Sequence, residues 1–372
     1  MHILVAPDAF KGSATNIAAA RAMALGVGDT WPDAKVTQCP LADGGEGTLS
    51  ALAAAAPGGE ATVPVIGPHG EALNAAYWRG AKGTAVIESA RAIGLPQTRY
   101  RDPLSATSAG AGMLCAAALV AGHRALRLAC GGSATVDGGV GALSALGFRF
   151  LDAAGRPLPP GGGALIHLAE IIPPPEVPAG VEIWCDVKNP LLGPAGAATV
   201  YGPQKGADAA AVAQLEAGLA RLARVLADTF GRDPSEVVGA GAAGGLAGGV
   251  WAALGAPLLS GFDVIAEMVG LDAHLSSADL VLTGEGRLDD QTAQGKTVAG
   301  VLERAQRVDV PVWAFAGDLA PSVAGAAPDG VVFVPIVEGP MTLSDAMGAA
   351  PSLIRRAVAR SFALARTSTS WP

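Results

Sequence analysis

The segment VLTGEGRLDDQTAQGKT, residues 281–297, begins as an apolar strand and then turns into glycines and charged residues. Read from Gly284, it gives G-x-G-x-x-D, one residue short of the dinucleotide fingerprint. Read from Asp290, it gives D-x-x-x-x-G-K-T, one residue short of a Walker A loop. Both matches fail at a carboxylate, which would repel a phosphate group. The segment therefore predicts a strand followed by a charged loop, but it predicts neither motif.

The same succession of apolar strand, glycine and acidic residue recurs near both ends of the chain. The strand HILVAPD (2–8) is followed by a helical apolar period with Ser13 as its N-cap, and then by the strand KVTQCPLAD (35–43). Near the C-terminus, ADLVLTGEG, VPVWAFAG and GVVFVPI alternate with helices. Such alternation is typical of a parallel sheet covered by helices. We expect an α/β fold with a doubly wound, Rossmann- or flavodoxin-like parallel-sheet domain formed by residues 1–60 and 263–372.

The middle of the chain, residues 61–262, has a different pattern. EATVPVIGPHGEALNAAYWR predicts a hairpin with GPHG as its turn, and FRFLDAAGRPL predicts a second hairpin. GTAVIE, HRALRLACGG and VEIWCDV add further strands, and irregular loops separate them. These mixed strands predict a second, mixed α/β domain that is inserted into the first.

Composition and charge exclude several classes of function. The 372 residues carry a net charge of −8 and contain no basic run, which disfavours nucleic-acid binding. The four cysteines are widely spaced without a CxxC motif, so we expect reduced, buried thiols in a cytoplasmic protein. Residues 237–262 are uncharged and resemble a membrane span. Their eight glycines and Pro257 favour a buried segment of a soluble protein instead.

Acidic residues follow many of the expected strands. In an open α/β sheet the carboxyl ends of the strands line the ligand crevice, so these residues are expected to face one region. They are Asp8, Asp43, Glu46, Asp137, Asp186, Glu285 and Asp289. Clustered carboxylates repel one another unless a cation lies among them. Mg²⁺, held through one or two carboxylates, waters and substrate phosphates, is the obvious candidate.

Basic residues occupy the glycine-rich loops of the same regions. They are Lys11, Lys205, Arg287 and Lys296. Side chains in such loops are suited to neutralise a phosphate or a carboxylate, and the glycines let backbone N–H groups approach phosphate oxygens. Phosphoryl transfer needs this set of groups: cations, positioning residues and a base for the attacking oxygen.

A second motif supports a rival interpretation. GAGAAG (239–244) matches GxGxxG, and Asp263 follows 19 residues later, as in an NAD(P)-dependent oxidoreductase. However, only Val237 and Val238 precede the motif, after a turn-like segment, so the leading strand is nearly missing. The other rival is a non-catalytic ligand-binding regulator on the same scaffold, against which the many charged loops argue.

Six segments occur in an order that resembles the glycerate kinase family, of the type found in bacterial glycerate and glyoxylate metabolism. They are APDAFKGS, ADGGEGT, GGSATVDGG, DVKNPLLGPAGAATVYGPQKGA, GAAGGLAGG and TGEGRLDDQTAQGK. The resemblance covers nearly the whole chain. It implies an ATP- and Mg²⁺-dependent kinase that phosphorylates D-glycerate, at the 2-hydroxyl. It also implies two α/β domains, one inserted into the other, with the active site in the cleft between them. A homodimer is one option for its assembly.

The chain departs from the family pattern at three positions. The family usually has serine at Ala9, asparagine at Val136 and an aromatic residue at Ala109. None of these changes removes a charged residue from the clusters.

The resemblance leads to a hypothesis for each group. Asp186 orients or deprotonates the attacking hydroxyl, Lys11 stabilises the transferring phosphoryl group, and Lys205 or Arg287 supplies a cation for the glycerate carboxylate. The other substrate-binding residues are expected to be Asp43, Glu46, Asn189 and Asp8. The ATP-binding residues are expected to be Gly284, Glu285, Gly286, Lys296, Ser133 and Asp137. Asp289 is expected to hold Mg²⁺.

Overall fold

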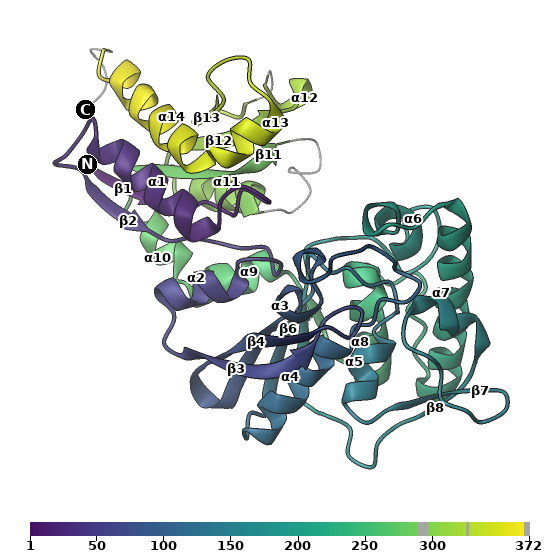
Figure 1. The fold of residues 1–372 in the computed structure, drawn as a ribbon. Helices are drawn as coiled ribbons and strands as arrows, with labels where there is room; N and C mark the ends of the chain where they lie inside the picture. Colours follow the sequence, from purple (N-terminus) through teal and green to yellow (C-terminus); the bar gives the residue numbers. More distant parts are fainter. Residues whose placement is uncertain (289–296, 325–326, 368–372) are drawn as a thin grey trace. The chain divides into compact units, whose positions relative to one another are not determined.

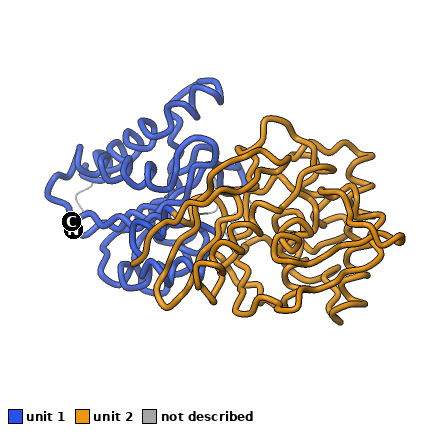
Figure 2. The backbone as a smooth tube through the Cα atoms, turned by 60° about the horizontal axis from the view of Figure 1, so that its bottom comes forward, with its two compact units in different colours: residues 1–43, 50–56, 262–372 blue, residues 44–49, 57–261 orange. Residues whose placement is uncertain are grey.

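The computed structural model divides the chain into two compact units, shown in Figure 1 and coloured separately in Figure 2. It describes residues 1–288, 297–324 and 327–367. Unit 1 comprises residues 1–43, 50–56 and 262–372, and unit 2 comprises residues 44–49 and 57–261.

Unit 1 is built on a five-stranded sheet in the order β13-β12-β11-β1-β2, in which every neighbouring pair is parallel. The strands are β1 (His2–Val5), β2 (Lys35–Gln38), β11 (Leu280–Leu288), β12 (Val312–Leu319) and β13 (Val331–Pro335). The chain passes from β1 to β2 on one side, and from β11 through β12 to β13 on the other. The winding therefore reverses between β1 and β11, and the predicted doubly wound α/β fold is confirmed.

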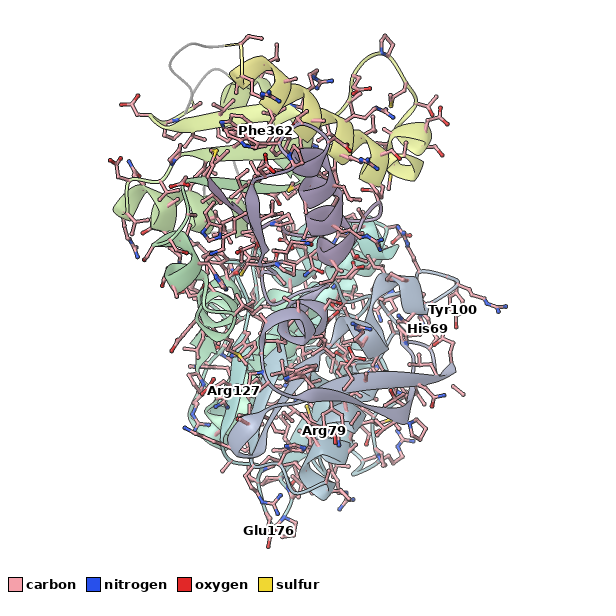
Figure 3. The ribbon with its side chains drawn as sticks, turned by 90° about the vertical axis from the view of Figure 1, so that its left-hand side faces the viewer. His69, Arg79, Tyr100, Arg127, Glu176 and Phe362 are labelled. Carbon is pink, nitrogen blue, oxygen red and sulfur yellow. The ribbon has the colours of Figure 1, made fainter. Side chains whose placement is uncertain are left out.

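Helices cover both faces of this sheet. On one face α1 (Asn16–Gly28) and α14 (Ala350–Ala365) pack on Phe315, and on the other α11 (Thr297–Arg307) packs beside Ala314 and Ala316. The three residues are consecutive on β12. They contact helices on opposite faces of the sheet because successive side chains of a strand point to opposite faces. Phe362 of α14 lies in the first of these cores, with its ring centroid 4.9 Å from that of Trp313 (Figure 3).

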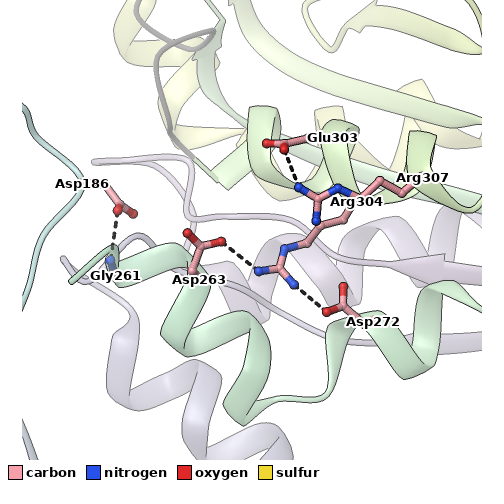
Figure 4. Close-up of polar contacts among 7 residues, drawn as sticks. All are labelled: Asp186, Gly261, Asp263, Asp272, Glu303, Arg304 and Arg307. Carbon is pink, nitrogen blue, oxygen red and sulfur yellow. Dashed lines mark hydrogen bonds and ion pairs between the residues drawn. The ribbon is translucent and has the colours of Figure 1, made fainter.

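Short helices complete unit 1. They are α10 (Leu271–Leu275), α12 (Pro321–Ala324) and α13 (Leu343–Gly348), while α2 (Thr48–Ala55) and α9 (Gly261–Met268) begin in unit 2 and continue into unit 1. Arg304 of α11 donates to Asp263 of α9 at 2.8 Å and to Asp272 of α10 at 2.6 Å (Figure 4). The α1 helix is capped by Thr15, whose hydroxyl accepts from the Ala18 N–H, and not by Ser13 as the sequence predicted.

Unit 2 contains a mixed sheet in the order β10-β9-β6-β5-β4-β3. Its strands are β3 (Gly59–Ile66), β4 (Ala72–Arg79), β5 (Thr84–Glu88), β6 (Ala125–Ala129), β9 (Val181–Trp184) and β10 (Leu258–Leu259). The β3–β4 pair is the predicted hairpin, and the Gly67 N–H donates to the Glu71 carbonyl across its turn.

The second predicted hairpin is present but short. After β7 (Arg149–Asp152) the chain turns back, with backbone hydrogen bonds from Asp152 to Arg156 and from Leu158 to Phe150, but the longer antiparallel partner of β7 is β8 (Leu168–Ile172). The intervening residues include a 3₁₀ turn at Gly162–His167 that packs on α7. Because this pairing spans a longer loop, the local turn signal does not reveal it.

The helices of unit 2 surround one large apolar core. They are α3 (Ala90–Ile93), α4 (Ala109–Val120), α5 (Val140–Ala145), α6 (Ala197–Tyr201), α7 (Ala209–Phe230) and α8 (Leu246–Leu254). The uncharged segment 237–262 contains α8, β10 and the first residues of α9, and most of α8 is buried in this core. Across the described residues, no helix is both long and apolar enough to span a membrane. The four cysteines carry free thiols, three buried and Cys185 half-buried.

Candidate functional site

The switch point of unit 1 carries a buried carboxylate. Asp8 follows β1 and is 2% exposed. One of its oxygens accepts from the Ala9 N–H at 2.7 Å, and the other accepts from the Thr297 hydroxyl at 2.6 Å, at the start of α11. Burial, and next the negative charge of Asp43, raise the pKa of Asp8 to about 8, although Lys11 opposes them. Asp8 can therefore hold or release a proton near neutral pH.

Lys11 is the cation of this group. Its ammonium lies 3.4 Å from the Asp43 carboxylate, and its side chain is 60% exposed. The charge of Asp43 raises the pKa of Lys11 above its usual value, and the charges of Asp8 and Glu285 act in the same direction. Three predicted acidic residues thus surround one predicted lysine, and the lysine remains charged and accessible to an anion.

β11 supplies the next residues of the site. Glu285 is 8% exposed, and the exposed Arg287 lies 3.4 Å from Asp318, which is on β12. At Gly284, a Cβ would fall 2.2 Å from the Phe315 carbonyl oxygen, so this glycine is required by close strand packing. Gly284 therefore serves the packing of the sheet.

A pocket of about 320 Å³ opens beside these residues. Its polar side includes Lys11, Glu285, Arg287 and Asp318, and its apolar side is formed by residues of α13, α14 and the segment after β13. The apolar side chains include Phe10, Ile336, Leu343, Met347 and Leu353. A mainly apolar pocket with a few convergent polar groups is the usual form of a small-ligand site.

Lys205 was expected to offer a cation to the glycerate carboxylate, but the structure buries its side chain among protein groups. It is 3% exposed in unit 2, and its ammonium donates to the Ser133 hydroxyl at 3.0 Å and to the Thr135 carbonyl at 2.8 Å. Burial lowers the pKa of Lys205 to about 7, against the charge of Asp137. In this arrangement the nitrogen bonds protein groups, so it holds the loop after β6 in place.

Asp137 is likewise enclosed. Its carboxylate is 1% exposed and accepts from the Ser108 N–H and hydroxyl, the Gly139 N–H and the Gly141 N–H. Burial raises the pKa of Asp137, and these hydrogen bonds oppose the shift. Ser133 and Asp137 therefore form a buried polar network with Lys205, and Asp137 organises the turn that leads into α5.

Asp186 and Asn189 follow β9 and have separate partners. The half-buried Asp186 carboxylate accepts from the Gly261 N–H at 2.9 Å, at the start of α9 (Figure 4). The Asn189 amide donates to the Ala195 carbonyl, and its oxygen accepts from the Tyr201 hydroxyl at 2.6 Å. Asn189 thus orders the loop that leads to α6, whereas Asp186 caps a helix.

The sequence analysis missed two polar residues. Thr297 binds Asp8, and the buried Glu88 at the end of β5 binds the loop that carries Glu46. The signal for Glu88 is a carboxylate that closes the apolar run TAVIE, and it differs from the other strand ends because no glycine follows. Thr297 ends the G-K-T of the near Walker A match, but nothing in the sequence relates it to Asp8.

Two predicted ligands lie outside the described residues: Asp289, expected to bind Mg²⁺, and Lys296, expected to bind ATP. Elsewhere, within the part of the chain that the structure describes, no three histidine, cysteine, aspartate or glutamate side chains form a group that could hold a metal ion.

The dinucleotide motif lacks its structural context. Residues 231–238 are all described and form no strand before GAGAAG, which folds into a 3₁₀ turn at Ala242–Gly245. Asp263, the acidic residue that follows the motif, pairs with Arg304. The oxidoreductase interpretation therefore has no support, since the fingerprint needs a strand, a tight turn and a helix.

Known proteins resemble this chain over nearly its full length. The family model "Glycerate kinase family" matches residues 3–366. A glycerate kinase from Bacillus subtilis is 41% identical over 99% of both chains, and a glycerate 2-kinase from Escherichia coli is 41% identical over 87% of both. A crystal structure from Salmonella typhimurium LT2, whose protein is assigned as glycerate kinase 2, matches with a TM-score of 0.80 and 39% identity over 99% of this chain and 98% of that one. The chain therefore belongs to the glycerate kinase family.

Proposed function

We propose that this protein transfers the γ-phosphoryl group of ATP to the 2-hydroxyl of D-glycerate, giving 2-phospho-D-glycerate. The family match and the 41% identity to a glycerate 2-kinase support this assignment. The observation that carries it is the group of Asp8, Lys11 and Glu285 beside a pocket at the switch point of a parallel sheet. Doubly wound enzymes bind their ligands at such switch points.

The pocket in unit 1 suits the nucleotide. Its apolar wall, which includes Leu343 and Met347, offers a surface for the adenine ring, while Lys11 can meet phosphate oxygens on the polar side. A lysine near the transferring group stabilises charge that grows in the transition state. Lys11 is therefore the group that we expect to contact the γ-phosphate.

Mg²⁺ fits the donors of this region. Glu285 and Asp43 present carboxylates next to Lys11, and Mg²⁺ needs only one or two carboxylates besides phosphate oxygens and waters. When bound, the ion would offset the negative charge of the β- and γ-phosphates. Asp289 stays our proposal for an additional ligand.

The remaining predicted residues divide between substrate contact and support. Asp186 is our candidate to orient or deprotonate the attacking hydroxyl, and Asp43 and Glu46 are candidates to accept from the hydroxyls of glycerate. Arg287 is the better candidate for the glycerate carboxylate, since the Lys205 ammonium is bonded to Ser133 and Thr135. Lys205, Ser133, Asp137 and Asn189 then act by ordering loops.

The four free thiols suit the reducing cytoplasm, where we expect the enzyme to act.

A coupled assay tests the function and the acceptor hydroxyl together. The protein is incubated with MgATP and D-glycerate, and enolase is then added without a phosphoglycerate mutase. Phosphoenolpyruvate forms only from the 2-phosphate, so its appearance with ADP supports the proposal, and a reaction without glycerate is the control. ADP without phosphoenolpyruvate would indicate the 3-hydroxyl. Binding of ATP or glycerate with no ADP release would instead indicate a regulator.

A further inference from the structure

The loop of residues 44–49 is closely packed within unit 2. All of its residues except Glu46 are buried. A Cβ at Gly44 would lie 3.1 Å from the Trp184 carbonyl oxygen, and a Cβ at Gly131 would lie 2.4 Å from the Gly45 Cα. The loop backbone therefore rests directly on the carboxyl ends of β9 and β6, and only the side chain of Glu46 reaches solvent.

One buried carboxylate holds this loop. Glu88, the last residue of β5, is 1% exposed. Its Oε1 accepts from the Gly47 N–H at 3.3 Å and its Oε2 accepts from the Leu49 N–H at 2.9 Å. The carboxylate thus bonds backbone groups on both sides of Thr48, at the start of α2, where the first N–H groups have no partner within the helix.

The charge of Glu88 is only lightly compensated. Its nearest cation is Arg91, whose Nε lies 3.5 Å from Oε1. Burial raises the pKa of Glu88, and the charge of Glu46 acts in the same direction. A buried charge is a costly way to close a turn, because an apolar or amide side chain avoids the desolvation penalty. Its use here calls for a reason beyond the stability of the fold.

We propose that Glu88 is a positioning residue for Glu46. By bonding the two amides that follow Glu46, it fixes the direction in which the Glu46 carboxylate leaves the loop. The inference rests on the proposed function, in which Glu46 accepts from a hydroxyl of glycerate. Glu88 itself is buried, so we expect it to act on the substrate only through the loop.

The conservative variant Glu88→Gln tests whether Glu88 anchors the loop through its hydrogen bonds or only fills space in the core. The amide has the same size, so β5 stays packed, but its NH₂ group must face one of the two backbone N–H donors. We expect KM for glycerate to rise about tenfold, which corresponds to the loss of one or two hydrogen bonds, with KM for ATP and the unfolding midpoint little changed. Glu182→Gln, in β9 of the same sheet, is the matched control, because Glu182 pairs with Arg127 and should leave both constants unchanged.

A double-mutant cycle tests whether Glu88 acts through Glu46. In a Glu46→Ala background, Glu88→Gln should have almost no further effect on KM for glycerate, because the side chain that it positions is gone. An equal rise of KM in both backgrounds would overturn the proposal and make Glu88 a merely structural residue.

Amide hydrogen exchange tests the anchoring without any substrate. In Glu88→Gln the amides of Gly47 and Leu49 should exchange at least tenfold faster than in the wild type, while those of β5 should not. Unchanged exchange at both amides would overturn the proposal even if the enzyme is active. If the wild type does not phosphorylate glycerate, the proposed function fails, and with it the role of Glu46. The exchange result then still decides whether Glu88 anchors the loop.

Discussion

The Lys11 ammonium lies 3.4 Å from the Asp43 carboxylate and thereby joins the segments that follow β1 and β2. The contact is exposed on the lysine side, and a pair of this kind contributes little to stability. Its value lies in keeping a charged nitrogen at the switch point, next to the buried Asp8 and Glu285. Lys11 and Lys205 are thus opposites: one is accessible, and the other is enclosed.

Lys11→Met should reduce kcat without unfolding the protein. Removing a cation from the transferring phosphoryl group typically lowers the rate roughly a thousandfold. The urea midpoint should change little, because the Lys11 side chain is largely exposed. Lys35→Met, at an exposed position of β2 in the same unit, is the control and should keep full turnover. Normal turnover in Lys11→Met would exclude Lys11 from the reaction.

Asp8→Asn should change how stability depends on pH. The folded protein raises the pKa of Asp8 from 3.8 to about 8, so the native state binds the proton more tightly than the unfolded chain does. Stability from this group is therefore complete below about pH 4 and is lost as the pH rises towards 8. The neutral amide avoids that loss. The free energy of unfolding of the variant, measured in urea relative to the wild type, should therefore rise by a few kcal/mol between pH 5 and pH 8.

A constant difference between Asp8→Asn and the wild type across that range would contradict the raised pKa. Asp272→Asn is the matched control, since Asp272 is an exposed carboxylate of the same unit that pairs with Arg304. It should show no comparable rise in relative stability between pH 5 and pH 8.

Lys205→Met should lower stability and activity together. Its ammonium satisfies the Thr135 carbonyl and the Ser133 hydroxyl, and leaving buried groups unpaired costs about 1–3 kcal/mol each. Because folding lowers the pKa of Lys205 to about 7, its contribution to stability grows as the pH rises above 7. The destabilisation measured in urea should therefore be larger at pH 9 than at pH 6. Lost turnover with unchanged stability would show that Lys205 contacts substrate instead.

The strand-end pattern predicted the parallel sheet, and it placed Asp8, Lys11 and Glu285 at one edge of that sheet, for one reason. Parallel strands expose their carboxyl ends at a common edge, so residues placed just after apolar runs come together whatever their separation in sequence. Asp8 and Glu285 are 277 positions apart, yet both influence Lys11. The sequence alone shows which residues lie at this edge, because the end of each apolar run marks the end of a strand.

The direction of a side chain is not encoded in the same way. Lys205 stands in a turn between Gly202 and Gly206, where a lysine is normally exposed, and only the tertiary packing of this turn against the loop after β6 turns it inward. Glu88 was missed for the converse reason. Its strand predicts burial, and its partners lie on a loop 39 and 41 positions away, which no local pattern identifies.

Asp186 offers the sharpest separation of catalytic from structural roles. Its Oδ1 accepts from the Gly261 N–H at 2.9 Å, and an asparagine oxygen can make the same hydrogen bond. Asp186→Asn should therefore keep the start of α9 while it removes the charge and the basicity that the attacking hydroxyl needs. We expect kcat to fall at least about a hundredfold with a nearly unchanged unfolding midpoint.

Asp186→Ala completes the comparison. It removes the charge and the cap together, so it should lose as much turnover as Asp186→Asn and, in addition, about 1 kcal/mol of stability. If the asparagine variant is nearly fully active and only the alanine variant is impaired, Asp186 is a cap for α9 and the base must be another carboxylate. If both lose turnover equally while only the alanine variant loses stability, the charge of Asp186 is what the reaction uses. Initial rates at saturating ATP and glycerate, measured beside urea midpoints, decide between these outcomes.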